Sequence, residues 1–273
     1  MKIGNREFDL QNHTYVMGIL NVTPDSFSDG GKFNNIDAAM RQVEKMVDEG
    51  ADIIDVGGES TRPGYTVISS QEEIDRVVPV IEKIKSQFDV PVSIDSYKSA
   101  VASAAVEAGA DLINDIWGLK RDPMMGKTVA KYDCPCCLMH NRAKAEYTDF
   151  LKEVFIDLKE TIRLALESGI AQDKIILDPG VGFAKSYEQN LDVLKYLEDF
   201  HQFGYPMLLA TSRKSVIGNT LNLPVDERVE GTIVTTVMAA MKHYSFVRVH
   251  DVKENKRAIQ MTEAIMKRSM FEI

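Results

Sequence analysis

Short runs of apolar residues alternate along the chain with longer segments of mixed character. Each run is continuous and does not alternate with polar residues, which is typical of strands buried on both faces of a parallel sheet. Polar loops that carry Gly or Pro bound the runs, so we expect each run to form one short strand. The runs cover residues 14–20, 51–57, 90–95, 110–116, 134–140, 174–180, 205–212 and 245–251.

Between these runs the apolar residues recur at helical spacing. In one segment every fourth residue is apolar, which places the apolar residues on one face of a helix. That segment contains Phe150, Val154, Leu158, Ile162 and Leu166. Further helices are expected over residues 36–49, 70–86, 97–107, 186–198, 226–242 and 252–269.

Eight strand–helix units within 273 residues predict an α/β fold, the (β/α)8 TIM barrel, as a single domain over residues 1–273. A doubly wound open sheet is the alternative, but eight units without a second domain favour the barrel. The composition is 44% hydrophobic, which is enough to build a sizeable core.

Charge and hydropathy exclude several classes of partner. The net charge of −9 argues against general binding to nucleic acid or to an anionic membrane. No apolar stretch approaches the roughly 20 residues that a membrane span needs, and the start MKIGNREFDL lacks the apolar core of a signal peptide. We therefore expect a soluble cytoplasmic protein with no nucleic-acid or membrane partner.

All three cysteines, Cys134, Cys136 and Cys137, lie within one predicted strand. Three neighbouring thiols cannot form a disulfide framework, and a zinc site would need further ligand pairs elsewhere. We interpret them as small apolar residues of a buried strand.

Nearly every predicted strand ends in a hydrogen-bonding side chain. In a barrel these ends converge on one face, where chemistry is expected, although loops after strands are polar in any barrel. The residues at these ends are Asn21, Asp55, Glu59, Thr61, Arg62, Asp95, Asn114, Asp115, His140, Asn141, Asp178, Ser212, Arg213, Lys214, Arg248 and His250.

Asp95, Asn114 and Asp178 end three different strands directly after apolar residues. Buried carboxylates are costly unless they are paired or hydrogen-bonded. One interpretation is a structural ion-pair network with Lys214 or Arg248. The functional interpretation is a pocket for a flat heterocycle, in which the carboxylates accept from amide and amine N–H groups and Lys214 donates to a ring carbonyl.

Arg248 and His250 lie two residues apart on the last strand, so their side chains share a face. They are either two surface residues or an anion site at the barrel mouth. The first and last strands are neighbours in a closed barrel, so Asn21 can complete this site or hold a metal ion.

Two long loops, 21–35 and 57–70, follow the first two strands. They are either plain turn-rich connections or mobile loops that close over a substrate and exclude water. In the second case Phe27 and Pro63 supply apolar walls, and Asp29 and Arg62 supply polar ones.

Eight motifs occur in order over residues 17–252, and together they resemble those of the dihydropteroate synthases. The first, second and sixth motifs are long and specific, and the resemblance covers essentially the whole chain. The motifs are MGILNVTPDSFSDGG, IDVGGESTRPG, SIDSYK, NDIWG, LMH, ILDPGVGFAK, TSRKS and RVHDV.

The resemblance implies a TIM barrel, a homodimer and Mg²⁺ as cofactor. It also implies a reaction: 6-hydroxymethyl-7,8-dihydropterin diphosphate and p-aminobenzoate condense to 7,8-dihydropteroate and diphosphate in folate biosynthesis. The strand-5 segment CPCCLMHNRA is richer in Cys than the family pattern, and Asn-Arg-Ala follows His140 in place of a sequence such as Met-Arg-Gly.

The family's site residues carry over by position. The resemblance assigns the pterin pocket to Asp95, Asn114, Met139, Asp178, Lys214 and Arg248, with Arg248 stacking on the pterin face. It assigns diphosphate contacts to Asn21, Thr61, Arg62, Arg248 and His250, and the metal to Asn21. It assigns p-aminobenzoate, whose place sulfonamides mimic, to Phe27, Thr61, Arg62, Pro63, Phe183 and Ser212.

The arylamine is a poor nucleophile, so we expect diphosphate to leave first, in a dissociative displacement with a methylene cation on the pterin. Mg²⁺, Arg248 and His250 would stabilise the leaving group, and Asp95 the cation. Lys214 completes the expected catalytic set of Asp95, Lys214, Arg248 and His250. No obligatory general base is expected.

Two rival functions stay open at this point. A pterin-dependent methyltransferase shares the barrel and the Asp/Asn/Asp grip but would need neither ESTRPG nor the Arg-x-His pair. A homologue that binds pterin without turnover would have lost Asn21, Lys214 or Arg248, and all three are present.

Overall fold

A computed structural model of the chain describes residues 1–23, 32–60 and 66–267. Within these residues eight parallel strands form one sheet in the order β8-β7-β6-β5-β4-β3-β10-β9, and a bridge between Leu177 and Met207 brings β8 beside β9. The sheet is therefore a nearly closed barrel, as predicted. Its strands are β3 (Tyr15–Asn21), β4 (Ile53–Gly57), β5 (Val92–Asp95), β6 (Leu112–Asp115), β7 (Cys136–Met139), β8 (Ile175–Asp178), β9 (Leu208–Leu209) and β10 (Phe246–Val249).

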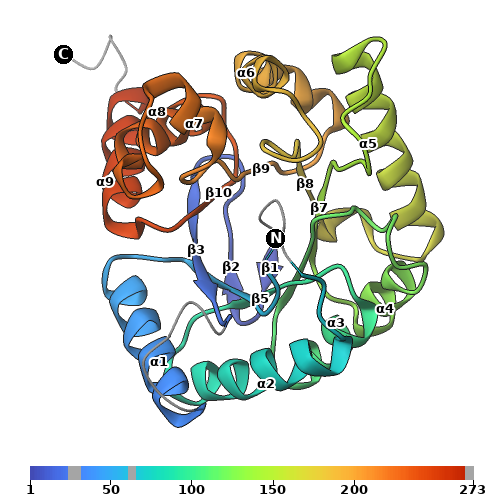
Figure 1. Cartoon of the computed structure of the whole chain (residues 1–273), viewed down its shortest axis with the longest axis vertical. Coiled ribbons are helices and arrows are strands. Elements are labelled where there is room, and N and C mark those ends of the chain that lie inside the picture. Colours follow the sequence, from blue (N-terminus) through green and yellow to red (C-terminus); the bar gives the residue numbers. More distant parts are fainter. Residues whose placement is uncertain (24–31, 61–65, 268–273) are drawn as a thin grey trace.

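Helices surround the barrel on the outside (Figure 1). The segment with an apolar residue at every fourth position forms one of them, α5, as the sequence predicts. The described helices are α1 (Lys32–Asp48), α2 (Ser70–Gln87), α3 (Ser99–Glu107), α4 (Met125–Tyr132), α5 (Phe150–Glu167), α6 (Tyr187–Lys195), α7 (Ser215–Leu221), α8 (Val229–Met241) and α9 (Val252–Met266).

Sequence patterning misplaced some boundaries and missed some elements. The expected strand 205–212 is reduced to Leu208–Leu209, because Pro206 has no N–H to donate and a turn begins where Lys214 N bonds Thr211 O. The helices α4 and α7 were not predicted, since both are short and each contains a Gly that weakens the helical pattern.

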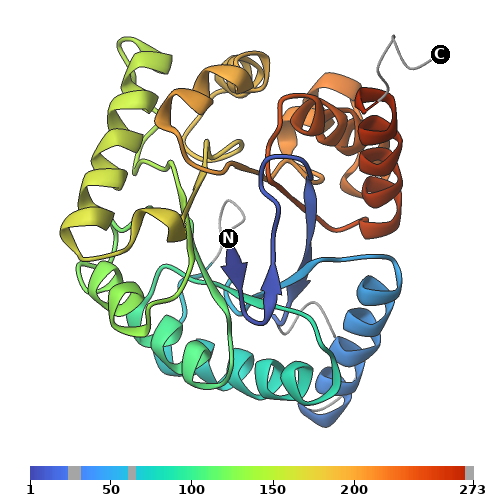
Figure 2. The same ribbon diagram turned by 180° about the vertical axis from the view of Figure 1, so that it is seen from behind.

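The N-terminal residues form a hairpin, β1 (Lys2–Ile3) with β2 (Arg6–Glu7), that was also not predicted because each strand has two residues. Figure 2 shows this hairpin lying across one end of the barrel. Ile3 and Phe8 pack there in one apolar cluster with strand residues of the barrel interior, including Met17, Leu112 and Phe246. That end of the barrel is filled, so the site must lie at the other.

The three cysteines are buried, as predicted. Cys137 lies in the same cluster as Ile3 and Phe8, whereas Cys134 and Cys136 belong to the larger core between strands and helices. Among the described helices, none combines the length and apolar character that a membrane crossing requires.

Candidate functional site at the carboxyl ends of the strands

The parallel register brings predicted site residues from different strands to one level. Asn21 pairs with Gly57, Gly57 with Asp95, and Asp95 with Asn114, so four neighbouring strands contribute to a single layer. Gly57 contributes no side chain to this layer. A Cβ atom at this position would contact both Asp95 Oδ2, at 3.7 Å, and Asn21 Oδ1, at 3.8 Å. Asn21 and Asp95 therefore face the same space.

Arg248 of β10 bridges two carboxylates across the barrel mouth. Its Nε donates to Asp55 Oδ2 at 2.5 Å, and its NH2 group donates to Asp95 Oδ2 at 2.6 Å. Asn114 Nδ2 donates to the same Asp55 oxygen at 3.3 Å. The side chain of Asp55 is fully buried, and among the described residues its Oδ1 has no hydrogen-bond partner. A buried lone acceptor is costly, so this oxygen is available to a ligand or a water molecule.

Burial shapes the charges of the two predicted pterin carboxylates. It raises the pKa of Asp95 to about 7, which the positive charge of Arg248 opposes and the negative charge of Asp55 reinforces. Burial also raises the pKa of Asp178, opposed by Lys214 and by the hydrogen bond from Gly180 N to Asp178 Oδ1 at 2.7 Å. Both carboxyls are thus removed from bulk water, and in such surroundings a hydrogen bond from a ligand is worth more than in water.

Lys214 lies between the β8 and β9 loops. Its Nζ donates to Val181 O at 2.5 Å and sits 4.7 Å from the centroid of the Phe183 ring. Burial lowers the pKa of Lys214 to about 8, and the Asp178 carboxylate opposes that shift. The structure therefore brings three predicted residues, Asp178, Phe183 and Lys214, together.

An apolar wall completes this part of the mouth. Met139 at the end of β7 packs with Tyr97 and Ile116 in a small buried cluster, against which Trp117 and Phe183 lie. Flat, hydrophobic walls with a few polar groups are what a heterocycle needs.

The last two strands join through Ser212 and His250. Ser212 Oγ lies 2.9 Å from His250 Nδ1 and accepts from His250 N at 3.1 Å. Between Ser212 and Lys214, Arg213 has a left-handed φ of 57° and pairs with Asp251 at 2.5 Å. A non-Gly residue in that conformation is strained, and the strain lets both neighbours of Arg213 reach the mouth.

A second buried charge cluster holds the region after β4. Lys98 Nζ donates to Glu59 and to Glu73 at 2.7 Å each, and also to Ile68 O at 2.8 Å. Glu59 accepts in addition from Tyr97 OH at 3.0 Å and from Ile68 N at 2.9 Å. The chain is therefore fixed by one cation both before and after residues 61–65.

Four predicted residues, Phe27, Thr61, Arg62 and Pro63, lie outside the residues that the structure describes, as does Asp29. Their assignments to p-aminobenzoate, to diphosphate and to loop closure stay predictions. The other ten predicted site residues lie at the carboxyl ends of barrel strands or in the loops that follow them.

Sequence reasoning missed three residues that shape the site. Asp55 was counted among the strand ends but not assigned to the pocket, Lys98 was not singled out, and Lys185 appeared only within a motif. The signal for Asp55 was a carboxylate inside an otherwise apolar strand, which needs a partner. Nothing local marks Lys98, because its acceptors lie 25 to 39 positions away along the chain. Lys185 bonds two carbonyls of its own loop, and its distant partner is His140.

No group of three or more His, Cys, Asp or Glu suited to a metal ion occurs in the described part of the chain. Mg²⁺ does not need one, since it commonly binds one or two protein oxygens together with substrate phosphates and water. The Asn21 amide oxygen is a suitable hard ligand beside the mouth, so the donor set fits a magnesium ion carried by a diphosphate.

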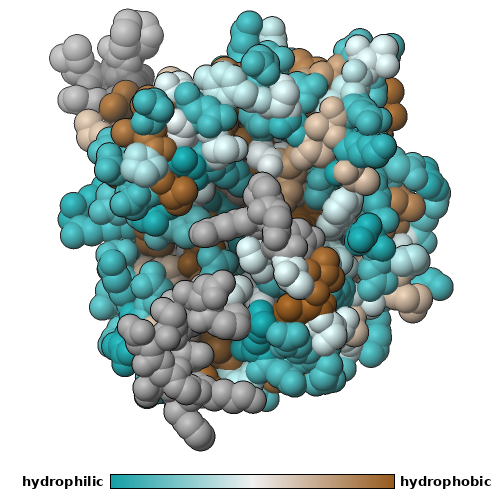
Figure 3. Space-filling model, viewed as in Figure 1, coloured by the Kyte–Doolittle hydropathy of each residue, from teal (hydrophilic) through white to brown (hydrophobic). Residues whose placement is uncertain are grey.

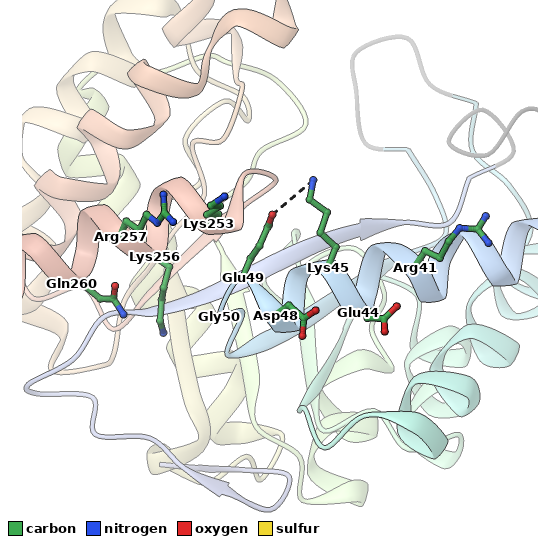
Figure 4. A pocket seen from close by; sticks show the side chains of 10 residues that line it. All are labelled: Arg41, Glu44, Lys45, Asp48, Glu49, Gly50, Lys253, Lys256, Arg257 and Gln260. Carbon is green, nitrogen blue, oxygen red and sulfur yellow. Dashed lines mark ion pairs between the residues drawn. The ribbon is translucent and has the colours of Figure 1, made fainter.

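A charged cleft of about 700 Å³ lies elsewhere, between α1 and α9 (Figure 4). Lys45 and Lys253 line it together with Glu44 and Asp48, so its charges are mixed. None of the described residues that line it ends a barrel strand, and the site is therefore not there.

Comparison with known proteins agrees with this geometry. Residues 17–250 match the family described as pterin binding enzyme. A dihydropteroate synthase of Clostridium beijerinckii is 61% identical over 98% of this chain and 100% of its own length. A dihydropteroate synthase of Clostridium difficile, solved with pteroic acid, is 50% identical with a TM-score of 0.93 over 96% of this chain and 100% of that one. The Yersinia pestis dihydropteroate synthase, solved with a sulfonamide drug, is 42% identical with a TM-score of 0.92 over 98% and 99%.

The match over residues 17–250 shows that this barrel, with buried carboxylates and cations at the carboxyl ends of its strands, is a pterin-binding enzyme. The chain belongs to that family, and within it to the dihydropteroate synthases, which are transferases of folate biosynthesis.

Proposed function

We propose that the described mouth of the barrel holds the dihydropterin among Asp95, Asn114, Met139, Asp178, Lys214 and Arg248. The observation that carries this proposal is the convergence of buried acceptors and two cations, Arg248 and Lys214, with Asp55 Oδ1 unpartnered among the described residues. The pterin's amide and amine N–H groups would meet the carboxylates, and Lys214 would donate to its carbonyl. The C. difficile relative, solved with pteroic acid, supports a pterin ligand of this kind.

The second substrate, p-aminobenzoate, would bind beside Phe183 and Ser212. Phe183 is half-buried and continues the apolar wall of Met139, so an aromatic ring placed there would adjoin the pterin. Pteroic acid contains both halves of the product, and the Y. pestis relative was solved with a sulfonamide drug, a compound class that the resemblance places at the p-aminobenzoate site.

In the reaction the C–O bond between the pterin methylene and the diphosphate breaks, and the electron pair leaves with the diphosphate. The arylamine nitrogen then forms the C–N bond and gives its proton to water. We assign stabilisation of the leaving group to Arg248 and His250, and stabilisation of the methylene cation to Asp95, whose Oδ2 is already bonded to Arg248. Lys214 would keep the pterin oriented.

Mg²⁺, when bound at Asn21 and the diphosphate, would neutralise charge that develops on the leaving group. Asn21 itself fixes where the diphosphate lies relative to Arg248 and His250. The position of the Asn21 amide oxygen, which faces the same space as Asp95, supports this assignment.

We also propose a homodimer built on α8 and α9. These helices pack together, and four of their large apolar side chains are more than half exposed among the described residues: Val234 (59% exposed), Met241 (56%), Met261 (63%) and Ile265 (62%). Figure 3 shows apolar side chains over this part of the surface, at the upper left. A cluster of this kind is typical of an interface. Met261→Asp should yield monomers in analytical ultracentrifugation. The matched change Ile156→Asp, on exposed α5, should not, and dimers of the Met261→Asp protein would refute the interface.

The reaction is tested by mixing the purified protein with 6-hydroxymethyl-7,8-dihydropterin diphosphate, p-aminobenzoate and Mg²⁺. Dihydropteroate should form only when both substrates are present, and it should disappear with a chelator and return with added Mg²⁺. Product formation that a chelator does not affect would refute the metal assignment alone. No product from protein that still binds the pterin would indicate a silent homologue.

A further inference from the structure

Lys185 lies in the loop between β8 and α6, and its ammonium group bonds backbone carbonyls of the same loop. Its Nζ lies 2.8 Å from Gly180 O, 3.0 Å from Phe183 O and 2.9 Å from His140 Nδ1. An ammonium group carries three donors, so these three acceptors satisfy it. Lys185 thus ties two carbonyls of one loop to a side chain at the end of β7.

The loop that Lys185 holds lies directly on the backbone after β7. Gly180 has a φ of 72°, and a Cβ atom there would come within 2.0 Å of His140 O, so only Gly fits. At Gly182 a Cβ atom would lie 2.8 Å from Lys214 Cδ. The Lys214 side chain therefore passes over the same loop, on its way to Val181 O.

The hydrogen bonds around His140 require one protonation state. As an ammonium group Lys185 can only donate, so His140 Nδ1 accepts, and the ring proton resides on Nε2, which donates to Asp157 Oδ2 at 3.0 Å. Arg142 Nε donates to the same oxygen at 2.6 Å. Burial lowers the pKa of His140 to about 4, in agreement with a neutral ring. The His140 side chain is fully buried, so its orientation is fixed.

We propose that Lys185, oriented by His140, is a positioning residue for p-aminobenzoate. Its bond to Phe183 O sets where the Phe183 ring stands, and its bond to Gly180 O holds the start of the same loop. Lys185 acts through the loop and has no assigned contact with either substrate. This inference rests on the proposed role of Phe183.

If Lys185 had a purely structural role, its replacement would lower stability and weaken the binding of both substrates to the same degree. The two KM values therefore distinguish a structural role from a positioning role. Lys185→Met should raise the KM for p-aminobenzoate about tenfold and change the KM for the dihydropterin diphosphate less than about threefold. Lys174→Met is the matched control, because Lys174 Nζ also bonds a backbone carbonyl, Asp133 O, but belongs to neither the loop nor the His140 network. It should change neither KM.

His140→Gln removes the ring Nδ1 that accepts from Lys185 but leaves Lys185 with its two carbonyls. It should raise the KM for p-aminobenzoate about threefold, and the double variant should be no worse than Lys185→Met alone, because His140 acts through Lys185. If Lys185→Met is not recovered folded, His140→Gln carries the test. An unchanged KM for p-aminobenzoate in the folded variant, a parallel rise in both KM values, or additive effects would overturn the proposal.

Phe183→Ala, measured alongside, separates this inference from the site on which it rests. If Phe183→Ala raises the KM for p-aminobenzoate and Lys185→Met does not, only the role of Lys185 is wrong. If neither change affects that KM, the proposed place of p-aminobenzoate is wrong as well.

Discussion

The ammonium group of Lys214 lies 4.7 Å from the centroid of the Phe183 ring. This cation–π contact joins a residue that we assign to the pterin with one that we assign to p-aminobenzoate. The two proposed pockets therefore share a wall, as a reaction that joins two rings requires. Phe183 belongs to the loop whose backbone carbonyls Lys185 bonds, including Phe183 O itself.

Phe183→Ala removes the ring from this wall. We expect the KM for p-aminobenzoate to rise about tenfold while kcat falls less, because lost contact with a bound ring weakens ground-state and transition-state binding alike. Steady-state kinetics with each substrate varied in turn measures the effect. Phe203→Ala, where the ring packs on Phe155 away from the mouth, is the control and should leave both KM values unchanged.

Arg248→Ala leaves the buried carboxylates of Asp55 and Asp95 without their shared cation. We expect the free energy of unfolding to fall by about 3 kcal/mol, as for other broken buried pairs, and kcat/KM to fall by at least about 100-fold. Urea denaturation and product formation measure the two effects. Arg163→Ala, which removes two exposed ion pairs on α5, should alter neither appreciably.

Full activity in a folded Arg248→Ala protein would refute the role of Arg248. Arg248→Lys restores one charge without the fork that spans two carboxylates, so it should recover part of the stability and little of the activity.

Activity should decline as the pH rises through about 8. Burial lowers the pKa of Lys214 to about 8, so its ammonium group is present below that pH and lost above it. A group whose pKa is lowered on folding also costs stability while it is charged, so stability should rise as the pH passes from about 8 towards 10.5. A pH profile of kcat/KM for the dihydropterin diphosphate measures the first effect.

Lys214→Arg is the matched variant, since a guanidinium group stays charged throughout this range. Its activity is expected to be lower, but without the alkaline decline near 8. A decline that persists unchanged in Lys214→Arg would show that another group titrates.

The thiols should be inert in the folded protein. Cys134, Cys136 and Cys137 are buried, and burial raises the pKa of Cys134 to about 12 and also raises the pKa of Cys136 and of Cys137 well above the usual thiol value. The thiolate is the reactive form, so a thiol reagent at pH 8 should modify none of them until denaturant is added, when all three react. Rapid modification of the native protein, followed by absorbance, would contradict the burial of the strand.

Much of the fold followed from patterning alone. Continuous apolar runs separated by helical segments predicted the barrel, because a strand covered on both faces needs apolar residues throughout. Boundaries were less secure: β9 has two residues where eight were expected, and the hairpin β1–β2 was too short to leave a pattern.

The sequence by itself determined which side chains meet at the barrel mouth. Asp95, Asn114, Asp178, Lys214 and Arg248 follow apolar runs, and parallel strands must bring such residues to one end. Only the tertiary structure decided how these residues pair. That Arg248 joins Asp55 to Asp95, and that Lys185 bonds His140, depends on contacts between residues 45 to 193 positions apart. The spacing of residues along the chain determines which way a side chain points and whether it is buried. Its hydrogen-bond partners depend on distances between strands and loops that are set only when the barrel closes.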